Sequence, residues 1–230
     1  MRHLHTTPLA KAGRTFAGTA GLLFGLMAVT PSSATIISGS VSVGGAGAVF
    51  QKLTTPLSNP FGPPDSVGLD NYQSPNLFGF DESQNTTLTS AISAGAGVVL
   101  SGGGLASGLT VASHYVFFDP VSGHVVGKVE FDSAVLAILT STATLSASDY
   151  LAKTGVNYLS PAARGLEAGD FATISGTGEV SIDFSASSPG DYVRVLTEFS
   201  PGAVPEPAGL ALVGLALVGA GAGALRRRAR

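Results

Sequence analysis

Short segments in which apolar and polar residues alternate constrain the fold of this chain more than any other feature. In residues 179–185, Val180, Ile182 and Phe184 alternate with polar residues, so the three apolar side chains would share one face of a strand. Similar segments lie at 109–118, 124–131, 134–140 and 171–175, with weaker ones at 36–43, 48–53, 86–93 and 98–100. The pattern predicts an all-β fold, an antiparallel β-sandwich of jelly-roll-like type.

Turn-forming residues predict how these strands connect. The sequence Ser-Pro-Gly-Asp at 188–191 predicts a tight turn that makes 178–199 a hairpin, and residues 120–123 would turn one strand into the next. The proline-rich stretch 53–80 predicts a long loop, either functional or packed as an Ω-loop. A single short helix is expected at 146–152, where Ser146 and Asp149 fit a capping pattern.

Charge is distributed unevenly along the chain. Of 12 Lys and Arg and 15 Asp and Glu in all, residues 35–204 hold 5 and 14, so the net charge of that segment is 5 − 14 = −9. Such an acidic domain would repel nucleic acid, which makes DNA or RNA an unsuitable partner. The chain has no Cys, which excludes disulfides, thiolate metal sites and a Cys nucleophile. It also lacks Trp, a frequent residue of sugar-binding surfaces.

The N-terminal residues have the layout of an export signal. Basic residues up to Arg14 precede an apolar stretch at 16–29, and Ser32 and Ala34 place small side chains at −3 and −1. The pattern predicts a signal peptide at 1–34, cut by signal peptidase between Ala34 and Thr35. A secreted all-β domain would then occupy residues 35–203.

The C-terminal residues have the layout of a membrane anchor. Residues 208–225 carry no charge, and as a helix they would span about 27 Å, close to a bilayer core of roughly 30 Å. Pro205 and Pro207 cannot lie inside a regular helix and mark its start. A basic cluster follows, which would remain on the cytoplasmic side and stop transfer: Arg226, Arg227, Arg228 and Arg230.

These residues carry a resemblance to a known family of signals. Val204-Pro205-Glu206-Pro207, followed by a span rich in Gly, Ala and Leu and by terminal arginines, resembles the PEP-CTERM sorting signal over residues 204–230. The resemblance implies processing by an exosortase, a membrane transpeptidase of Gram-negative bacteria that make exopolysaccharide. It further implies a transient anchor in the inner membrane, cleavage near residues 205–207, and delivery to the cell surface or extracellular matrix.

The middle of the chain resembles, in its layout, the uncharacterised ectodomains that accompany this signal. The resemblance lies in residues 70–82, 112–120 and 187–197. It implies no catalytic residue.

Catalytic patterns are few in the sequence. There is no G-x-S-x-G elbow, and His114 and His124 are the histidines of the mature segment that could act as a base. With Asp119 they could meet across a hairpin as zinc ligands, although zinc needs three or four ligands at fixed spacing. Two facing carboxylates could hydrolyse a glycoside. The candidates for such a pair are Asp119, Glu130, Asp132, Glu167, Asp170, Glu179 and Asp183.

We expect no cofactor, but the acidic loops raise one hypothesis, that the protein binds calcium. Ca²⁺ takes six to eight oxygen ligands from carboxylates, amides and backbone carbonyls. Two loops supply them: Asp70 with Asp81 and Glu82 downstream, and the segment that ends at Asp170. We therefore expect these four residues to be the ligands if calcium binds.

The expected function is that of a non-catalytic structural or adhesive protein associated with exopolysaccharide, as in a biofilm matrix. The alternatives are a calcium-dependent carbohydrate-binding module and a polysaccharide-active hydrolase or lyase. Facing carboxylates in a cleft would favour the enzyme. A shallow aromatic strip with Tyr72, Phe78 or Tyr115 would favour the binding module, and a closed sandwich with neither would favour the structural role.

Overall fold

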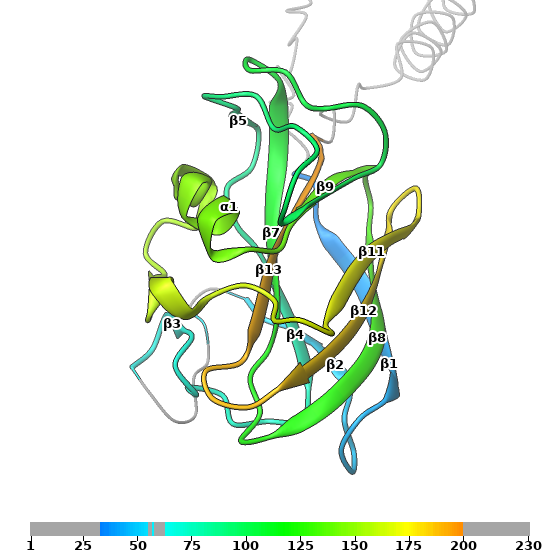
Figure 1. Ribbon diagram of the computed structural model, residues 1–230, viewed down its shortest axis with the longest axis vertical. Coiled ribbons are helices and arrows are strands. Elements are labelled where there is room, and N and C mark those ends of the chain that lie inside the picture. Colours follow the sequence, from blue (N-terminus) through cyan, green and yellow to red (C-terminus); the bar gives the residue numbers. More distant parts are fainter. Residues whose placement is uncertain (1–32, 55–56, 58–62, 200–230) are drawn as a thin grey trace, which may run out of the picture.

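Two β-sheets make up most of the computed structural model, which describes residues 33–54, 57 and 63–199 (Figure 1). The four-stranded sheet is antiparallel throughout and has the order β1 (Ile36–Val43), β8 (Gly123–Phe131), β12 (Glu179–Ala186) and β11 (Phe171–Gly176). These strands confirm the expectation of an all-β fold. Of the signal peptide expected at 1–34 only the last two residues are described, and the sorting signal at 204–230 lies outside the described residues.

The seven-stranded sheet is mixed. Its order is β2 (Phe50–Lys52), β4 (Leu77–Asp81), β7 (Thr110–Phe118), β13 (Asp191–Glu198), β9 (Val135–Leu139) and β6 (Val98–Leu100), and β5 (Thr86–Thr87) pairs with β7. The pairing of β2 with β4 is parallel, and the other pairs are antiparallel. A small parallel pair joins β3 (Ser66–Val67) to β10 (Asn157–Tyr158).

The two sheets pack face to face through one apolar core. Strand β8 shows the pattern behind this packing, since Val125 and Val129 are buried while Lys128 and Glu130 face solvent. From the other sheet, Val116 and Val195 enter the same core. The four-stranded sheet therefore has one dry face and one wet face, which is why its strands alternate in sequence.

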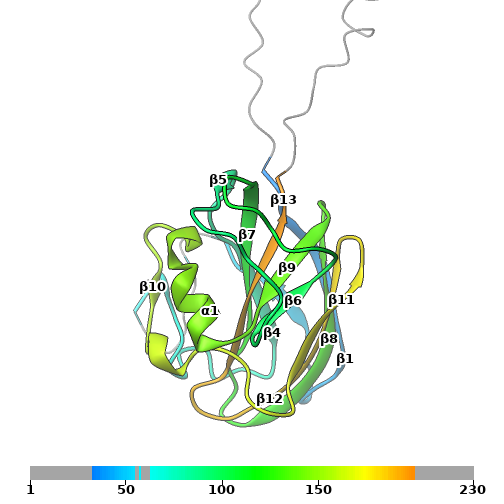
Figure 2. The ribbon, with the colours of Figure 1, turned by 45° about the horizontal axis from the view of Figure 1, so that its top comes forward.

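A second core lies on the outer face of the seven-stranded sheet. It holds Tyr115 and Phe117 of β7 together with Leu145 of α1 (Thr142–Ala147). The 3₁₀ turns Asp149–Leu151 and Pro161–Ala163 and the surrounding loops complete the cover (Figure 2). Because both faces of this sheet are covered, β7 and β13 are buried along nearly their whole length. No helix of the described ranges is long and apolar enough to cross a membrane.

The prediction that 178–199 forms a hairpin was wrong. Strand β12 pairs with β8 and β11, whereas β13 pairs with β7 and β9, so the turn between them crosses from one sheet to the other. Gly190 allows this crossing, because its φ is +92° and a Cβ there would lie 2.7 Å from the carbonyl oxygen of Phe118. Residues 120–123 likewise connect β7 to β8 in the opposite sheet instead of forming a hairpin.

Three other expectations need correction. The helix begins at Thr142, not at Ser146, because Ser141 forms the N-cap and exchanges hydrogen bonds with Thr144 in a capping box. The stretch 53–80 is not all loop, since it contains β3 and most of β4. Of the strand expected at 86–93, only Thr86–Thr87 is extended in a sheet.

Both ends of the described domain lie at the same pole (Figure 2). The backbone of Thr35 exchanges hydrogen bonds with Asp132, and the N–H of Glu198 donates to the carbonyl of Ala134 at 2.9 Å. The connections from β7 to β8 and from β12 to β13 lie at the opposite pole (Figure 1). We call this second end the distal pole.

Candidate functional site

Asp81, one of the expected calcium ligands, is held inside an ion-pair network. Its carboxylate lies 2.7 Å from Nζ of Lys52 and 2.8 Å from Nδ1 of His114, and it accepts a hydrogen bond of 2.9 Å from the N–H of Ile36. Burial alone would raise the pKa of Asp81, but the hydrogen bonds from His114 and Lys52 outweigh it and lower the pKa far below its usual range. The carboxylate therefore serves the packing of β1 against β4.

His114 connects this network to Thr197. Its Nε2 lies 3.0 Å from Oγ1 of Thr197, so Asp81, His114 and Thr197 have the connectivity of an acid, a base and a hydroxyl nucleophile. Both His114 and Thr197 are fully buried, however. Since a nucleophile must reach its substrate, the arrangement serves structure in this conformation.

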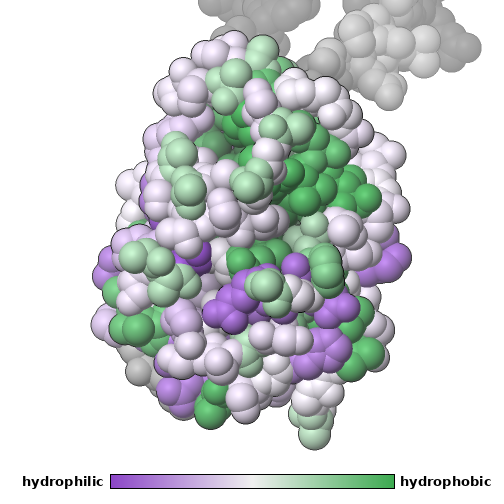
Figure 3. All heavy atoms as spheres, in the orientation of Figure 1, coloured by the Kyte–Doolittle hydropathy of each residue, from purple (hydrophilic) through white to green (hydrophobic). Residues whose placement is uncertain are grey.

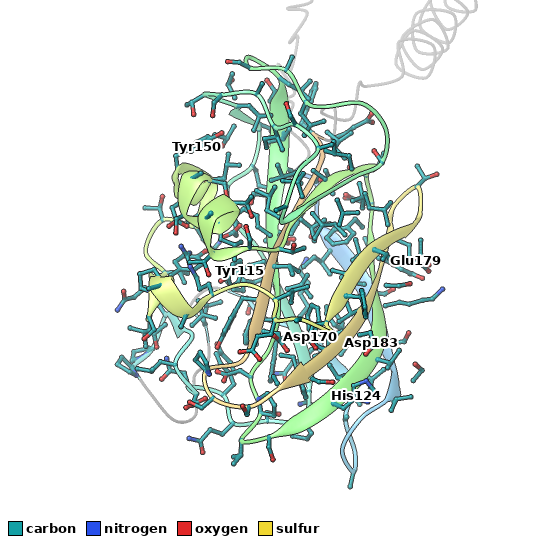
Figure 4. The ribbon with its side chains drawn as sticks, in the orientation of Figure 1. Tyr115, His124, Tyr150, Asp170, Glu179 and Asp183 are labelled. Atoms are coloured by element: carbon teal, nitrogen blue, oxygen red, sulfur yellow. The ribbon has the colours of Figure 1, made fainter. Side chains whose placement is uncertain are left out.

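His124 lies on the other sheet and does not approach His114. Its Nε2 is 2.8 Å from Oδ1 of Asp183 on the exposed face of the four-stranded sheet (Figure 4). The zinc arrangement with Asp119 therefore does not form. Across the described ranges, no group of three or more His, Asp and Glu converges as a metal centre.

Glu82, the second expected ligand in this segment, is buried in a separate network on the opposite face of the sheet. Arg194 binds both of its oxygens, at 2.7 and 3.0 Å, and the hydroxyls of Ser113 and Tyr158 donate to it at 2.6 and 2.5 Å. Burial lowers the pKa of Arg194 by itself, but the adjacent Glu82 more than compensates and raises it. Neither Asp81 nor Glu82 has a carboxylate free for a metal.

Asp70 lies at the distal pole, close to a carboxylate that the calcium hypothesis did not include. The N–H of Tyr72 donates to Oδ2 of Asp119 at 3.1 Å, and the Ser188 hydroxyl donates to Asp70. Burial raises the pKa of Asp119 to about 6, a backbone hydrogen bond from Tyr72 opposes this, and Asp70 adds to it. This cluster joins the loop 68–73 to the end of β7.

Asp170 belongs to a different acidic cluster. Its Oδ1 accepts a hydrogen bond of 2.7 Å from the N–H of Ser185 (Figure 4). Its charge acts on Asp191, whose pKa is raised to about 7 by burial first and then by Asp170 and Glu167. Asp119 continues the alternation of Phe117, and Asp191 that of Val193, so the two side chains lie on opposite faces of the seven-stranded sheet. The four expected calcium ligands thus do not share one site.

The aromatic residues considered for a sugar-binding strip are core residues. Tyr72, Phe78 and Tyr115 are all buried. Phe78 stacks on Phe117 with ring centroids 5.2 Å apart, and Tyr72 meets Phe117 edge to face at 5.0 Å. No strip of these three rings is available to a ligand.

A groove runs along the side of the molecule between β6, the edge strand of the seven-stranded sheet, and β11, the edge strand of the four-stranded sheet. Its main hollow has a volume of about 600 Å³, and hollows of about 310 and 350 Å³ adjoin it through the shared residues Val99 and Thr173 at one end and Leu136 and Glu198 at the other. Hydroxyl groups line it among apolar side chains, and Phe171 and Phe199 stand at its two ends with 59% and 44% exposed. Figure 3 shows the apolar surface that gathers over β9, above β11.

The comparisons with known proteins found no match. No protein-family model, no curated protein and no solved structure matches it. The groove had no signal in the sequence, because it arises where two edge strands from different sheets meet. Asp119 was visible as an acidic residue after a strand, but its partner Asp70 lies 49 residues away.

Proposed function

We propose that this chain is an exported cell-surface or extracellular-matrix protein of a Gram-negative bacterium, processed by an exosortase and associated with exopolysaccharide. The observation that carries the proposal is the order of features in residues 204–230: a Pro-Glu-Pro motif, an uncharged span of membrane length and a terminal arginine cluster. The predicted signal peptide at 1–34 is consistent with it, because both ends of the chain then direct the middle across the inner membrane.

The placement of the domain's ends supports a tethered role. Thr35 and Glu198 both lie beside residues 132–134, so an attachment at either end leaves the distal pole facing away from the tether. We further infer a jelly-roll-like sandwich, in which β7–β8 runs alongside β13–β12. In this role the domain is a non-catalytic adhesive component of the matrix.

The groove is the surface we assign to exopolysaccharide. Its length suits an extended chain, its hydroxyl groups can exchange hydrogen bonds with sugar hydroxyls, and exposed rings such as Phe171 and Phe199 can stack on sugar faces. Glu167 and Asp170 at one end and Glu198 at the other add negative charge. The charge favours a neutral glycan over an anionic one.

Export is tested in the native host with the sorting motif changed. Replacing Pro205, Glu206 and Pro207 together by Ala should leave the protein in the inner membrane, whereas Pro201→Ala, a control just outside the motif, should reach the surface like the wild type. Membrane fractionation followed by immunoblotting distinguishes the two. Surface delivery of the triple variant at the wild-type level would refute processing at this motif.

Binding is tested by co-sedimentation with exopolysaccharide purified from the host. Phe171→Ala and Thr173→Glu should each reduce the bound fraction, while Val121→Ala, which changes an exposed apolar residue away from the groove, should not. Equal binding by all variants would refute the groove as the contact surface. Release of reducing ends by the wild type would instead establish the hydrolase alternative.

A further inference from the structure

A buried carboxylate at the distal pole is covered by a loop of unusual backbone conformation. Asp119 has 0% of its surface exposed. The loop above it holds Leu69, Asp70 and Gln73 at positive φ, and the N–H of Ser74 donates to the backbone carbonyl of Asp119 at 3.0 Å. The residue directly after the loop 68–73 is therefore tied by its backbone to the residue that follows β7.

Buried polar atoms without hydrogen-bond partners concentrate at this point. Within the described ranges seven buried side-chain N or O atoms lack a partner, and four of them belong to this loop and the carboxylate beneath it: Asp70 Oδ1, Asn71 Nδ2, the Tyr72 hydroxyl and Asp119 Oδ1. Buried polar atoms in folded proteins are nearly always paired, because an unpaired one costs roughly 1–3 kcal/mol. The concentration indicates a ligand that would satisfy several of these atoms together.

Basic side chains of the domain do not neutralise these acids. Lys52 and Lys153 contact Asp81, Lys128 binds Glu179, Arg164 binds Asp149 and Arg194 binds Glu82. They account for all five Lys and Arg between residues 35 and 204. Among the described residues, Asp70 and Asp119 therefore have no Lys or Arg between them to offset their repulsion, and burial makes that repulsion costly.

We infer that Asp70 and Asp119 form a binding site for a divalent cation, and the ligand chemistry favours calcium. Each carboxylate has one oxygen already bonded to the protein, by the Ser188 hydroxyl and the Tyr72 N–H, and one oxygen left without a partner. Asn71 can offer its amide oxygen after a half-turn of the side-chain amide. Carboxylate and amide oxygens are the ligands that calcium prefers.

The site would contain two carboxylates, not three. This agrees with the finding that no three acidic or histidine residues of the described ranges converge. Asn71, backbone carbonyls and water would complete the six to eight oxygens that calcium takes. Because Asp70 is hydrogen-bonded to Ser188, a bound cation would join three segments at the distal pole: the loop 68–73, the end of β7 and the turn after β12.

Calcium binding by the full chain tests the inference. The chain is purified in mild detergent, stripped with EDTA and titrated with CaCl₂ by calorimetry. A second titration uses Tb³⁺, whose luminescence is sensitised by nearby tyrosines such as Tyr72. We expect one ion per chain and a calcium-dependent rise in melting temperature. Asp119→Asn and Asp70→Asn should each weaken calcium binding about tenfold or more, since each removes one of the two charges.

Asp191→Asn is the matched control. Asp191 is 2% exposed and also has an unpartnered oxygen, but its side chain lies on the opposite face of the same sheet. This variant should bind calcium and Tb³⁺ as the wild type does. If Asp119→Asn fails to fold, the calcium affinity of Asp70→Asn tests the inference, because Asp70 is only half-buried. Absence of calcium binding by the wild type, unchanged affinity in the Asp70 variant, or equal loss in the Asp191 variant would overturn the inference.

Discussion

Removing Arg194 should strongly destabilise the domain. Its side chain is fully buried between β13 and α1 and makes two hydrogen bonds to Glu82. It also donates to the carbonyl of Leu145 at 3.0 Å and to the Ser148 hydroxyl at 2.6 Å. Arg194→Met keeps much of the volume but leaves the Glu82 carboxylate buried with only hydroxyl donors.

The expected loss follows from this geometry. Breaking a buried ion pair by removing one partner costs about 3–5 kcal/mol, because the remaining charge has no compensation. The total stability of a domain is only about 5–15 kcal/mol, so the variant should approach the threshold of folding. The double variant Arg194→Met with Glu82→Gln should lose clearly less than the sum of the single losses, since it removes both charges together.

Urea unfolding of the full chain in detergent, followed by circular dichroism, measures these free energies. Lys128→Met provides the control, because Lys128 forms an ion pair with Glu179 on the exposed face and should lose at most about 1 kcal/mol. A loss of less than about 1 kcal/mol for Arg194→Met would refute a buried pair. Additive losses in the double variant would show that the two side chains do not interact.

Three further predictions concern other carboxylates. The pKa of Asp191 is raised to about 7, so the folded state holds a proton that the unfolded state releases near pH 4, and stability should fall as pH rises between these values; Asp191→Asn should flatten that part of a melting profile. The pKa of Asp81 is lowered, so its contribution to the free energy of unfolding should be present at neutral pH and vanish in acid. In urea unfolding, Asp81→Asn should therefore show its greatest loss of stability, about 2–4 kcal/mol, at pH 7. The backbone nitrogen of Thr35 lies 2.8 Å from Oδ1 of Asp132, so cleavage after Ala34 would place a new ammonium group beside this carboxylate. Asp132→Asn should then destabilise the processed chain more than the unprocessed one, by up to about 1 kcal/mol.

Strands could be predicted both in the sheet with one wet face and, as for β7, in the sheet whose two faces are covered. Strands β1, β8 and β12 were found close to their observed bounds because buried and exposed residues alternate along β8 and β12. Strand β4 was missed because it has only five residues and four of them, Leu77–Phe80, are buried, so no alternation marks so short a strand. Its position after a proline-rich stretch hid it further.

The pairing of the strands could not be predicted from the turns. A Ser-Pro-Gly-Asp turn reverses the chain, but the sequence does not say whether the next strand joins the same sheet or the opposite one. Here the turn crosses between sheets, since Val193 and Phe184 meet in one core from opposite sides. Long-range packing determines which sheet the next strand joins, and local sequence propensity does not predict it.

At the candidate sites, too, the residue types could be predicted from the sequence but their partners could not. Asp81 and Glu82 have the composition of a calcium loop, yet their partners His114 and Arg194 lie 33 and 112 residues further along the chain. Only the folded register brings these charges together and uses up the carboxylates. Asp70 was an expected ligand, but Asp119 meets it only through the fold of the loop 68–73.

The mass of the mature protein tests the central proposal most directly. The protein is recovered from the surface or matrix of its host and measured intact, with peptide mapping of both ends. We expect a chain that starts at Thr35 and ends near residues 204–207, without the span and the terminal arginines. In a strain that lacks its exosortase, we expect an unprocessed C-terminus. Surface protein that retains peptides from residues 208–230 in the normal strain would contradict it.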